Sequence, residues 1–241
     1  MERSVYVGWD PREADAFKVA VHSIQRRLTQ PIHIHSLQLD ALTAQGLYRR
    51  PIRWVAAFAR AAGVMWDTLS EAPMATEHAN ARFLVPHLAK AGWAAFMDGD
   101  ILVKADLAEL FTGLDPLKAV YCVQHDHAPT PGVKMDNQIQ TRYRRKNWSS
   151  VMVFNCDHPA NARLTLDLIN TAPGRDLHRF CWLQDDEIGA LDPAWNYLVG
   201  HSDPAIAPKI VHFTEGVPNM PGYSKVQYAD EWFSELMRAT L

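Results

Sequence analysis

The sequence predicts a mixed α/β fold in which a mostly parallel central sheet is flanked by helices. Three observations support this class. Short apolar runs alternate with segments of helical periodicity along most of the 241 residues. Several of these runs lack the polar alternation of a half-exposed strand, so they indicate strands that are buried on both faces. Strands that alternate with helices are typical of parallel sheets with helices packed on them.

The first half of the chain alternates predicted strands and helices. The first strand ends in Gly8 and Asp10, and the third runs directly into Asp98. The second strand alternates Ile with His, so we expect one of its faces to be exposed to water. Pro86 predicts a kink in the second helix, and residues 40–73 match neither period. The predicted elements are a strand at 4–10, a helix at 13–28, a strand at 31–37, a helix at 75–92 and a strand at 93–98.

The second half continues this alternation and closes with an amphipathic helix. Residues 128–148 are polar and basic, which predicts a long excursion between two buried strands. A length of 241 residues favours a single domain with one sizeable core. The predicted elements are strands at 118–126, 149–155 and 209–213 and helices at 159–170 and 228–241.

The composition excludes several classes of function. The formal net charge is −3, which gives no reason to expect a nucleic acid or an anionic membrane as a partner. No apolar run approaches the ~18 residues of a membrane span, and the apolar stretch near the N-terminus is too short for a signal peptide. Three cysteines without metal-ligand spacing favour a reducing compartment. We therefore expect a cytoplasmic protein with no transmembrane segment.

Polar side chains follow the apolar runs of the predicted strands. Asp10, Asp98, His125, Asn155 and His212 each come at or just after the end of such a run. Ligands of open α/β sheets bind outside the carboxyl ends of the strands. The repetition of this pattern therefore predicts a binding site along that edge of the sheet.

The stretch Asp98-Gly99-Asp100 places two carboxylates between two apolar runs. Side chains two residues apart in an extended segment point to the same side, so one cation can contact both. Oxygen ligands suit Mg²⁺ or Mn²⁺. His212 follows another apolar run and could complete the coordination of Mn²⁺. The alternative is a solvated turn between two elements, in which Asp-Gly is a common pair.

Five segments in this order, "FMDGDILV", "ADLAELF", "SSVMVFNC", "WLQDDEIGAL" and "VHFTEG", resemble the family 8 retaining glycosyltransferases of the GT-A fold. The resemblance covers the chain from its first strand nearly to its C-terminus. It implies a UDP-sugar donor and Mn²⁺, with Mg²⁺ as the alternative, held by Asp98, Asp100 and His212. It also implies one GT-A domain, with a nucleotide-binding half at 1–125 and a sugar and acceptor half at 126–241.

The resemblance also implies roles for other residues. Asp185 and Asp186 match the acidic segment that faces the reacting carbon, although the family usually has Asp-Gln there. They are the implied catalytic residues, of which one would either form a covalent intermediate or only stabilise positive charge. The donor-contacting loop carries Trp-Ser-Ser where the family commonly has Asn-Ala-Gly, and the family's lysine after the last glycine is missing. The implied donor-binding residues are Gly8, Asp10, Arg12, Arg82, Asp98, Gly99, Asp100, Trp148, Ser149, Ser150 and Gly216.

Other readings of these motifs stay open. In a haloacid dehalogenase-type phosphatase, Asp98 would be the nucleophile and Asp100 a general acid, but that motif normally opens the chain. A sugar nucleotidyltransferase would need a glycine-rich phosphate loop after the first strand. A transferase fold that binds nucleotide without turnover is a third alternative. The acceptor, a glycan or a small molecule, and the oligomeric state are not predicted.

Two polar segments have competing interpretations. The His-Asp-His triplet at 125–127 is either a second metal site or a set of hydrogen-bonding loop histidines. The basic run at 142–146 would bind a charged acceptor, or it is a solvated face. The loop and solvated-face readings are the ones we favour.

Overall fold

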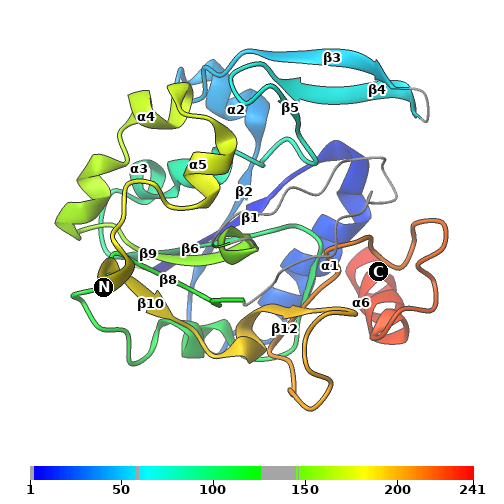
Figure 1. Cartoon of the computed structure of the whole chain (residues 1–241). Coiled ribbons are helices and arrows are strands. Elements are labelled where there is room, and N and C mark those ends of the chain that lie inside the picture. Colours follow the sequence, from blue (N-terminus) through cyan, green and yellow to red (C-terminus); the bar gives the residue numbers. More distant parts are fainter. Residues whose placement is uncertain (1–2, 58–59, 126–144, 146) are drawn as a thin grey trace.

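The computed structural model describes residues 3–57, 60–125, 145 and 147–241. Its centre is a six-stranded sheet with helices on both faces (Figure 1). The strands of this sheet are β1 (Arg3–Gly8), β2 (His33–Leu37), β6 (Trp93–Met97), β8 (Val120–Cys122), β9 (Val151–Asn155) and β10 (Ile188–Ala190). Their order is β10-β8-β9-β6-β1-β2. All pairings are parallel except those of β9, which runs antiparallel to β6 and β8. The predicted mixed α/β class is confirmed.

Two small sheets flank the central one. The first, in the order β11-β12-β7, comprises β7 (Ile101–Val103), β11 (Tyr197–Leu198) and β12 (Ile210–His212). The second is antiparallel and comprises β3 (Ile52–Ala57), β4 (Arg60–Asp67) and β5 (Ala72–Pro73). The predicted strand at 209–213 exists, but it pairs in the first small sheet rather than in the central one.

The helices lie on two sides of the central sheet because successive strand residues point to opposite faces. One face packs against α2 (Leu39–Ala44), α3 (Val85–Ala89), α4 (Leu166–Thr171) and α5 (Gly174–His178). The other face packs against α1 (Ala14–Gln25), and α6 (Ala229–Thr240) lies on α1 and the β7–β12 sheet. Figure 1 shows this division, with α3, α4 and α5 on one side and α1 and α6 on the other. None of the described helices is long and apolar enough to cross a membrane.

Short 3₁₀ helices replace parts of the predicted elements. The predicted helix at 75–92 is only η2 followed by α3, and Pro86 lies in the first turn of α3, where its missing N–H breaks no helical bond. The predicted helix at 159–170 is divided, because Thr165 Oγ1 accepts from the Leu168 N–H and caps a new helix. The 3₁₀ helices are η1 (Pro11–Glu13), η2 (Ala81–Leu84), η3 (Leu107–Phe111), η4 (Trp148–Ser150), η5 (Pro159–Arg163), η6 (Asp185–Glu187) and η7 (Pro193–Asn196).

The antiparallel strand β9 corrects the prediction made for Asn155. Asn155 pairs with Trp93, the first residue of β6, so it lies at the edge of the sheet where β6 begins. Asp98 follows the other end of β6. Asn155 therefore does not belong to the site predicted along the carboxyl ends. Its side chain instead donates to the Pro116 carbonyl oxygen.

The β3–β4 hairpin, in the region that matched neither period, is joined to the body by a buried ion pair between Arg50 and Asp67. The Arg50 guanidinium also donates to the carbonyl oxygens of Ile169 and Ala172, at 2.6 and 2.7 Å, next to α4. The Asp67 carboxylate accepts from the side chain of Asn80, which precedes η2. This Arg50–Asp67 network therefore connects the hairpin, α4 and the segment that leads to Arg82.

Candidate functional site

Three potential metal ligands come together at the junction of the central sheet and the β7–β12 sheet. One ligand atom from each of Asp98, Asp100 and His212 lies within 4.8 Å of the others. Asp98 follows β6 and Asp100 precedes β7, while antiparallel pairing places His212 opposite Ile101. The Phe213 N–H donates to the Asp100 carbonyl oxygen at 3.0 Å, which fixes the register. The backbone of three strands therefore holds this cluster.

Asp100 and His212 face one another without forming a hydrogen bond. Asp100 Oδ1 is buried and has no hydrogen-bond partner among the described residues, although His212 Nε2 lies 3.3 Å away. His212 Nδ1 lies 3.0 Å from Asn196 Oδ1, and because that amide oxygen only accepts, Nδ1 carries the proton. In the neutral ring, the lone pair of Nε2 then points toward a carboxylate oxygen. This arrangement fits a cation between the two groups.

The orientation of Asn196 follows from its other contacts. The Ser150 hydroxyl donates to the Asn147 carbonyl oxygen, so Ser150 Oγ accepts from Asn196 Nδ2 at 2.8 Å. The same amide nitrogen lies 3.0 Å from His125 Nε2. Asn196 is fully buried, and these contacts use its oxygen and its nitrogen. Outer contacts of this kind orient metal-binding histidines in other proteins.

Asp98 is held by two basic side chains. The Arg82 guanidinium contacts both carboxylate oxygens, at 2.8 and 3.3 Å, and His78 Nε2 lies 3.1 Å from Oδ1. Burial alone would raise the pKa of Asp98, but the Arg82 charge and the His78 hydrogen bond hold that pKa well below its usual range. Asp98 is therefore ionised, as a metal ligand must be.

Two glycines allow the first strand to meet the Asp98–Asp100 turn. A Cβ on Gly99 would lie 2.5 Å from the Gly8 carbonyl oxygen. A Cβ on Gly8 would lie 2.5 Å from the ring of His78. Both residues were predicted to bind the donor. The structure gives them a packing role, because only glycine permits these approaches.

The loop after β1 carries a second group of charged residues. Arg12 makes two side-chain hydrogen bonds to Asp10, at 2.9 and 2.6 Å, and the Glu77 N–H donates to the same carboxylate. Burial would raise the pKa of Asp10, but these hydrogen bonds lower it overall. Glu13 differs: burial and the negative charges of Asp100 and Asp10 raise its pKa to about 8.

On the opposite side of Asp98 from this loop lies the segment Trp148-Ser149-Ser150. The carbonyl oxygen of Ser149 accepts from Arg82 at 2.9 Å, and its hydroxyl lies 2.7 Å from His178 Nδ1. Trp148 donates its ring N–H to the carbonyl oxygen of His125. The predicted donor-contacting segment is thus linked to Asp98 through the Arg82 guanidinium and through the Asp98 N–H, which donates to the Ser150 carbonyl oxygen at 3.0 Å.

Gly216 and the acidic pair Asp185-Asp186 have contacts and positions that the resemblance did not describe. The Gly216 N–H donates to the Phe213 carbonyl oxygen at 2.9 Å, so it is already engaged within its own turn. Asp185 and Asp186 precede β10, whose first residue lies level with Ala94, near the start of β6. In Figure 1 this end of β10 lies on the side marked N. The two aspartates are exposed at the edge of the sheet opposite Asp98.

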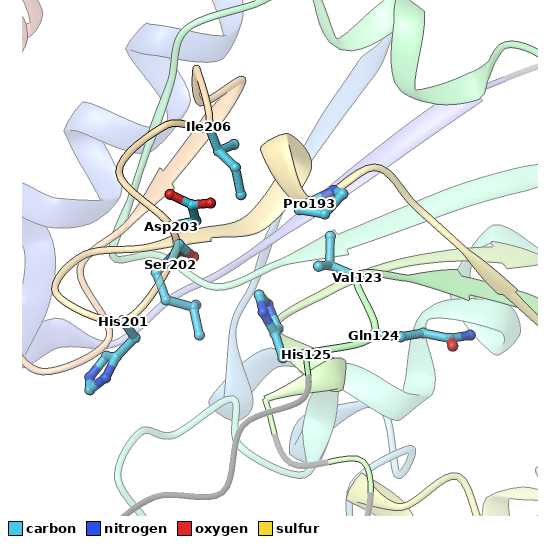
Figure 2. Close-up of a pocket in the computed structure, with 9 residues that line it drawn as sticks. Val123, Gln124, His125, Pro193, His201, Ser202, Asp203 and Ile206 are labelled. Atoms are coloured by element: carbon cyan, nitrogen blue, oxygen red, sulfur yellow. Dashed lines mark hydrogen bonds between the residues drawn. The ribbon is translucent and has the colours of Figure 1, made fainter.

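A pocket of about 230 Å³ lies beyond Asn196, between the segment after β8 and residues 198–206. In Figure 2 the His125 ring points into this pocket, whereas His201 points outward. Ser202 and Asp203 add polar groups to the wall, and Pro193 and Ile206 add apolar surface. The contact between Asn196 and His125 connects the pocket to the cluster of Asp98, Asp100 and His212. The lining residues are Val123, Gln124, His125, Pro193, Leu198, His201, Ser202, Asp203 and Ile206.

Sequence reasoning missed four residues of this site: His78, Asn196, His178 and Glu13. His78 lies four residues before Arg82, and Asn196 follows an apolar run, but neither stands in a pattern specific to binding. Asp126, His127 and residues 142–144 and 146 lie outside the described residues, so the readings of those segments stay predictions. The same holds for the division of the domain at residue 125.

The sequence of one curated relative shows to which family this chain belongs. Protein CDI from Arabidopsis thaliana is 41% identical over 238 residues, which cover 96% of this chain and 85% of the relative. The chain belongs to the Protein CDI family. No protein-family model matches it.

Solved structures show which fold this Protein CDI family member has. The galactosyltransferase LgtC, solved with donor and acceptor sugar analogues, aligns with 99% of this chain and 96% of its own, with a TM-score of 0.59 and 14% identity. The bifunctional glycosyltransferase WbbM aligns with a TM-score of 0.64 and 16% identity, and GlyE of Streptococcus pneumoniae with 0.59 and 14%. The chain spans only 51% of WbbM and 60% of GlyE. The predicted GT-A fold is confirmed.

Proposed function

We propose that the protein is a metal-dependent retaining glycosyltransferase of family 8 type that moves a hexose from a UDP-sugar to an acceptor hydroxyl. One observation carries the proposal: the buried, unpartnered Asp100 Oδ1 faces the Nε2 of His212 beside an ionised Asp98, among the described residues of a GT-A fold. Two carboxylates and an imidazole form a ligand set suited to Mn²⁺, and Mg²⁺ is the alternative. Asp98, Asp100 and His212 would hold the ion.

The bound cation would neutralise the charge that develops on the departing diphosphate. The residues of the chain then position the donor. Arg82 holds Asp98 and the Ser149 carbonyl in place, and Asn196 keeps the proton of His212 on Nδ1. The loop at Asp10 and Arg12 would receive the nucleoside. Retention can arise either through a carboxylate nucleophile on the face opposite the diphosphate or by acceptor attack on the face that the diphosphate leaves. Because Asp185 and Asp186 precede β10, near the start of β6 and away from Asp98, the proposed mechanism takes the second route.

The pocket beyond Asn196 is the proposed acceptor site. Its volume of about 230 Å³ is of the size of a single sugar unit or another small molecule, and it adjoins the metal cluster through His125. An imidazole, a hydroxyl and a carboxylate can hydrogen-bond to a polyol, while Pro193 and Ile206 offer apolar surface. These groups favour a neutral, hydroxyl-bearing acceptor, a glycan end or a small molecule.

Three unpaired thiols support the proposal of a cytoplasmic enzyme. The cysteines are free: Cys122 is buried and Cys181 is exposed. Exposed free thiols are typical of reducing compartments.

Thermal unfolding of wild type and Asp100→Asn with UDP, GDP or phosphate, each with and without Mn²⁺, tests the function. A ligand at 100 times its Kd adds about 2.7 kcal/mol, which raises Tm by roughly 5–11 °C for a domain of this size. We expect a shift that needs both UDP and Mn²⁺ and is lost in Asp100→Asn. A response to GDP would change the donor. No nucleotide response, with stabilisation by Mg²⁺ and beryllium fluoride, would replace the proposal with a phosphatase.

A further inference from the structure

A line of contacts crosses Asp98 from the loop after β1 to α5. On the side of that loop, His78 Nδ1 lies 3.3 Å from the Trp9 carbonyl oxygen, and its Nε2 lies 3.1 Å from Asp98. On the other side, Arg82 joins Asp98 to Ser149. Ser149 Oγ then lies 2.7 Å from Nδ1 of His178, the last residue of α5. If the nucleoside binds at the first end, His178 lies on the side of the sugar.

His178 is held in place with one ring nitrogen left over. Its ring meets that of Phe83 edge to face, with centroids 5.2 Å apart, and Nδ1 is used by Ser149. Nε2 makes no hydrogen bond to any described residue, and it is not among the buried polar atoms that lack a partner. The side chain is half-buried. The fixed ring therefore offers Nε2 to whatever occupies the adjacent space.

The chemistry of the ring distinguishes between kinds of ligand. Burial, and then the positive charge of Arg82, lower the pKa of His178 to about 3, so its imidazole is neutral. A neutral imidazole is a poor partner for a phosphate, which binds best to charged or charge-assisted donors. It is a good partner for a hydroxyl, which can either donate or accept. Its hydrogen bond to the Ser149 hydroxyl shows this compatibility within the protein.

We propose that His178 determines donor specificity by hydrogen-bonding through Nε2 to a hydroxyl of the transferred sugar, with Ser149 fixing the ring. The proposal rests on the proposed function, because it takes a nucleotide-sugar as the ligand. A site that hydrogen-bonds a particular hydroxyl discriminates against sugars that lack it or orient it differently, because a polar group is then left unpaired. His178 acts here on the sugar and not on the nucleotide.

Isothermal titration calorimetry in Mn²⁺ with UDP, UDP-glucose, UDP-galactose, UDP-N-acetylglucosamine and UDP-xylose tests the proposal. The variant His178→Phe keeps an aromatic ring against Phe83 and removes the polar nitrogens, while His178→Gln restores a polar end. His33→Phe, on the edge strand β2, is the matched control. We expect wild type and the control to prefer one sugar. In His178→Phe the Kd for UDP should stay within about twofold, and the preference between sugars should fall about tenfold.

The outcomes separate the two proposals. If wild type binds neither UDP nor GDP, the proposed function fails and this inference fails with it. If UDP binds but His178→Phe keeps the wild-type preference, or wild type has no preference among the four sugars, only the inference is overturned. Loss of UDP binding in His178→Phe together with His178→Gln would make the residue structural and would also overturn it. Partial recovery of the preference in His178→Gln supports it.

Discussion

Substitution of Gly99 by Ala should disable the cation site more than it destabilises the fold. The new Cβ would lie 2.5 Å from the Gly8 carbonyl oxygen, whereas real Cβ atoms essentially never come closer than 3.0 Å. Gly8 ends β1, which is paired on both sides in the central sheet. The Asp98–Asp100 turn, rather than the strand, must therefore move, by at least about half an ångström.

The size of this displacement sets the expected effects. Metal–ligand distances tolerate about 0.2 Å, so two of the three ligands would leave their positions, and we expect Mn²⁺ affinity to fall at least about tenfold. Overpacking of a buried contact costs about 1–3 kcal/mol. At roughly 2–4 °C per kcal/mol, Tm should fall by about 2–12 °C.

Electron paramagnetic resonance of free Mn²⁺ measures the affinity, and scanning calorimetry measures Tm. Gly113→Ala is the matched control, because Gly113 is exposed, has φ +70° and has nothing within 4 Å of the place that a Cβ would take. We expect that variant to lose a similar amount of stability and none of its Mn²⁺ affinity. Wild-type Mn²⁺ binding by a folded Gly99→Ala protein would refute the reasoning.

Three further outcomes are expected. Asn196→Leu removes the acceptor that orients His212, so Mn²⁺ affinity in a titration should fall about 10–100-fold. Asp67→Asn breaks a buried ion pair and should lower the urea-derived free energy of unfolding by about 3–5 kcal/mol, against about 1 kcal/mol or less for the half-exposed Asp15→Asn. Burial and a neighbouring guanidinium lower the pKa of His178 from 6.5 to about 3. Between these values the unfolded chain binds more protons, so stability is complete above pH 6.5 and falls with acidification. His178→Gln should reduce this loss of stability on acidification, measured as the free energy of unfolding at each pH. An unchanged dependence of that free energy on pH would contradict the prediction.

The buried strands, and the approach of Asp98, Asp100 and His212 to one another, are the parts of the structure that the sequence predicts well. β6 is an unbroken apolar run and β1 and β9 each contain one, and such runs have few alternatives to a buried strand. The carboxylates of Asp98 and Asp100 are visible as charges between two of these runs. The two carboxylates approach His212 because Asp98 follows the end of β6 and His212 ends β12, and these two strand ends lie together.

The sequence does not show the direction of each strand in the sheet or the contacts of residues such as Asn196 and His178, which surround the predicted ligands. No sequence feature near β9 indicates that this strand runs antiparallel to β6. Because it does, Asn155 lies at the edge of the sheet where β6 begins, opposite the edge with Asp98. The sequence also does not show that Asp185 and Asp186 lie where β10 begins, where Asp185 pairs with Arg145. Asn196 and His178 act through partners that lie 16, 29 and 46 residues away in the chain, and no sequence period reports such pairs.

The Arg50–Asp67 network has a consequence for motion. One guanidinium holds the carbonyl oxygens beside α4 and the carboxylate at the end of β4, and the same carboxylate holds Asn80. Breaking any one of these contacts exposes the buried charge of Arg50 or Asp67, on which the remaining contacts depend. The β3–β4 hairpin, α4 and the segment leading to Arg82 should therefore exchange their amide hydrogens as one cooperative unit. A ligand that steadies Arg82 would then slow exchange in the hairpin, far from the cation.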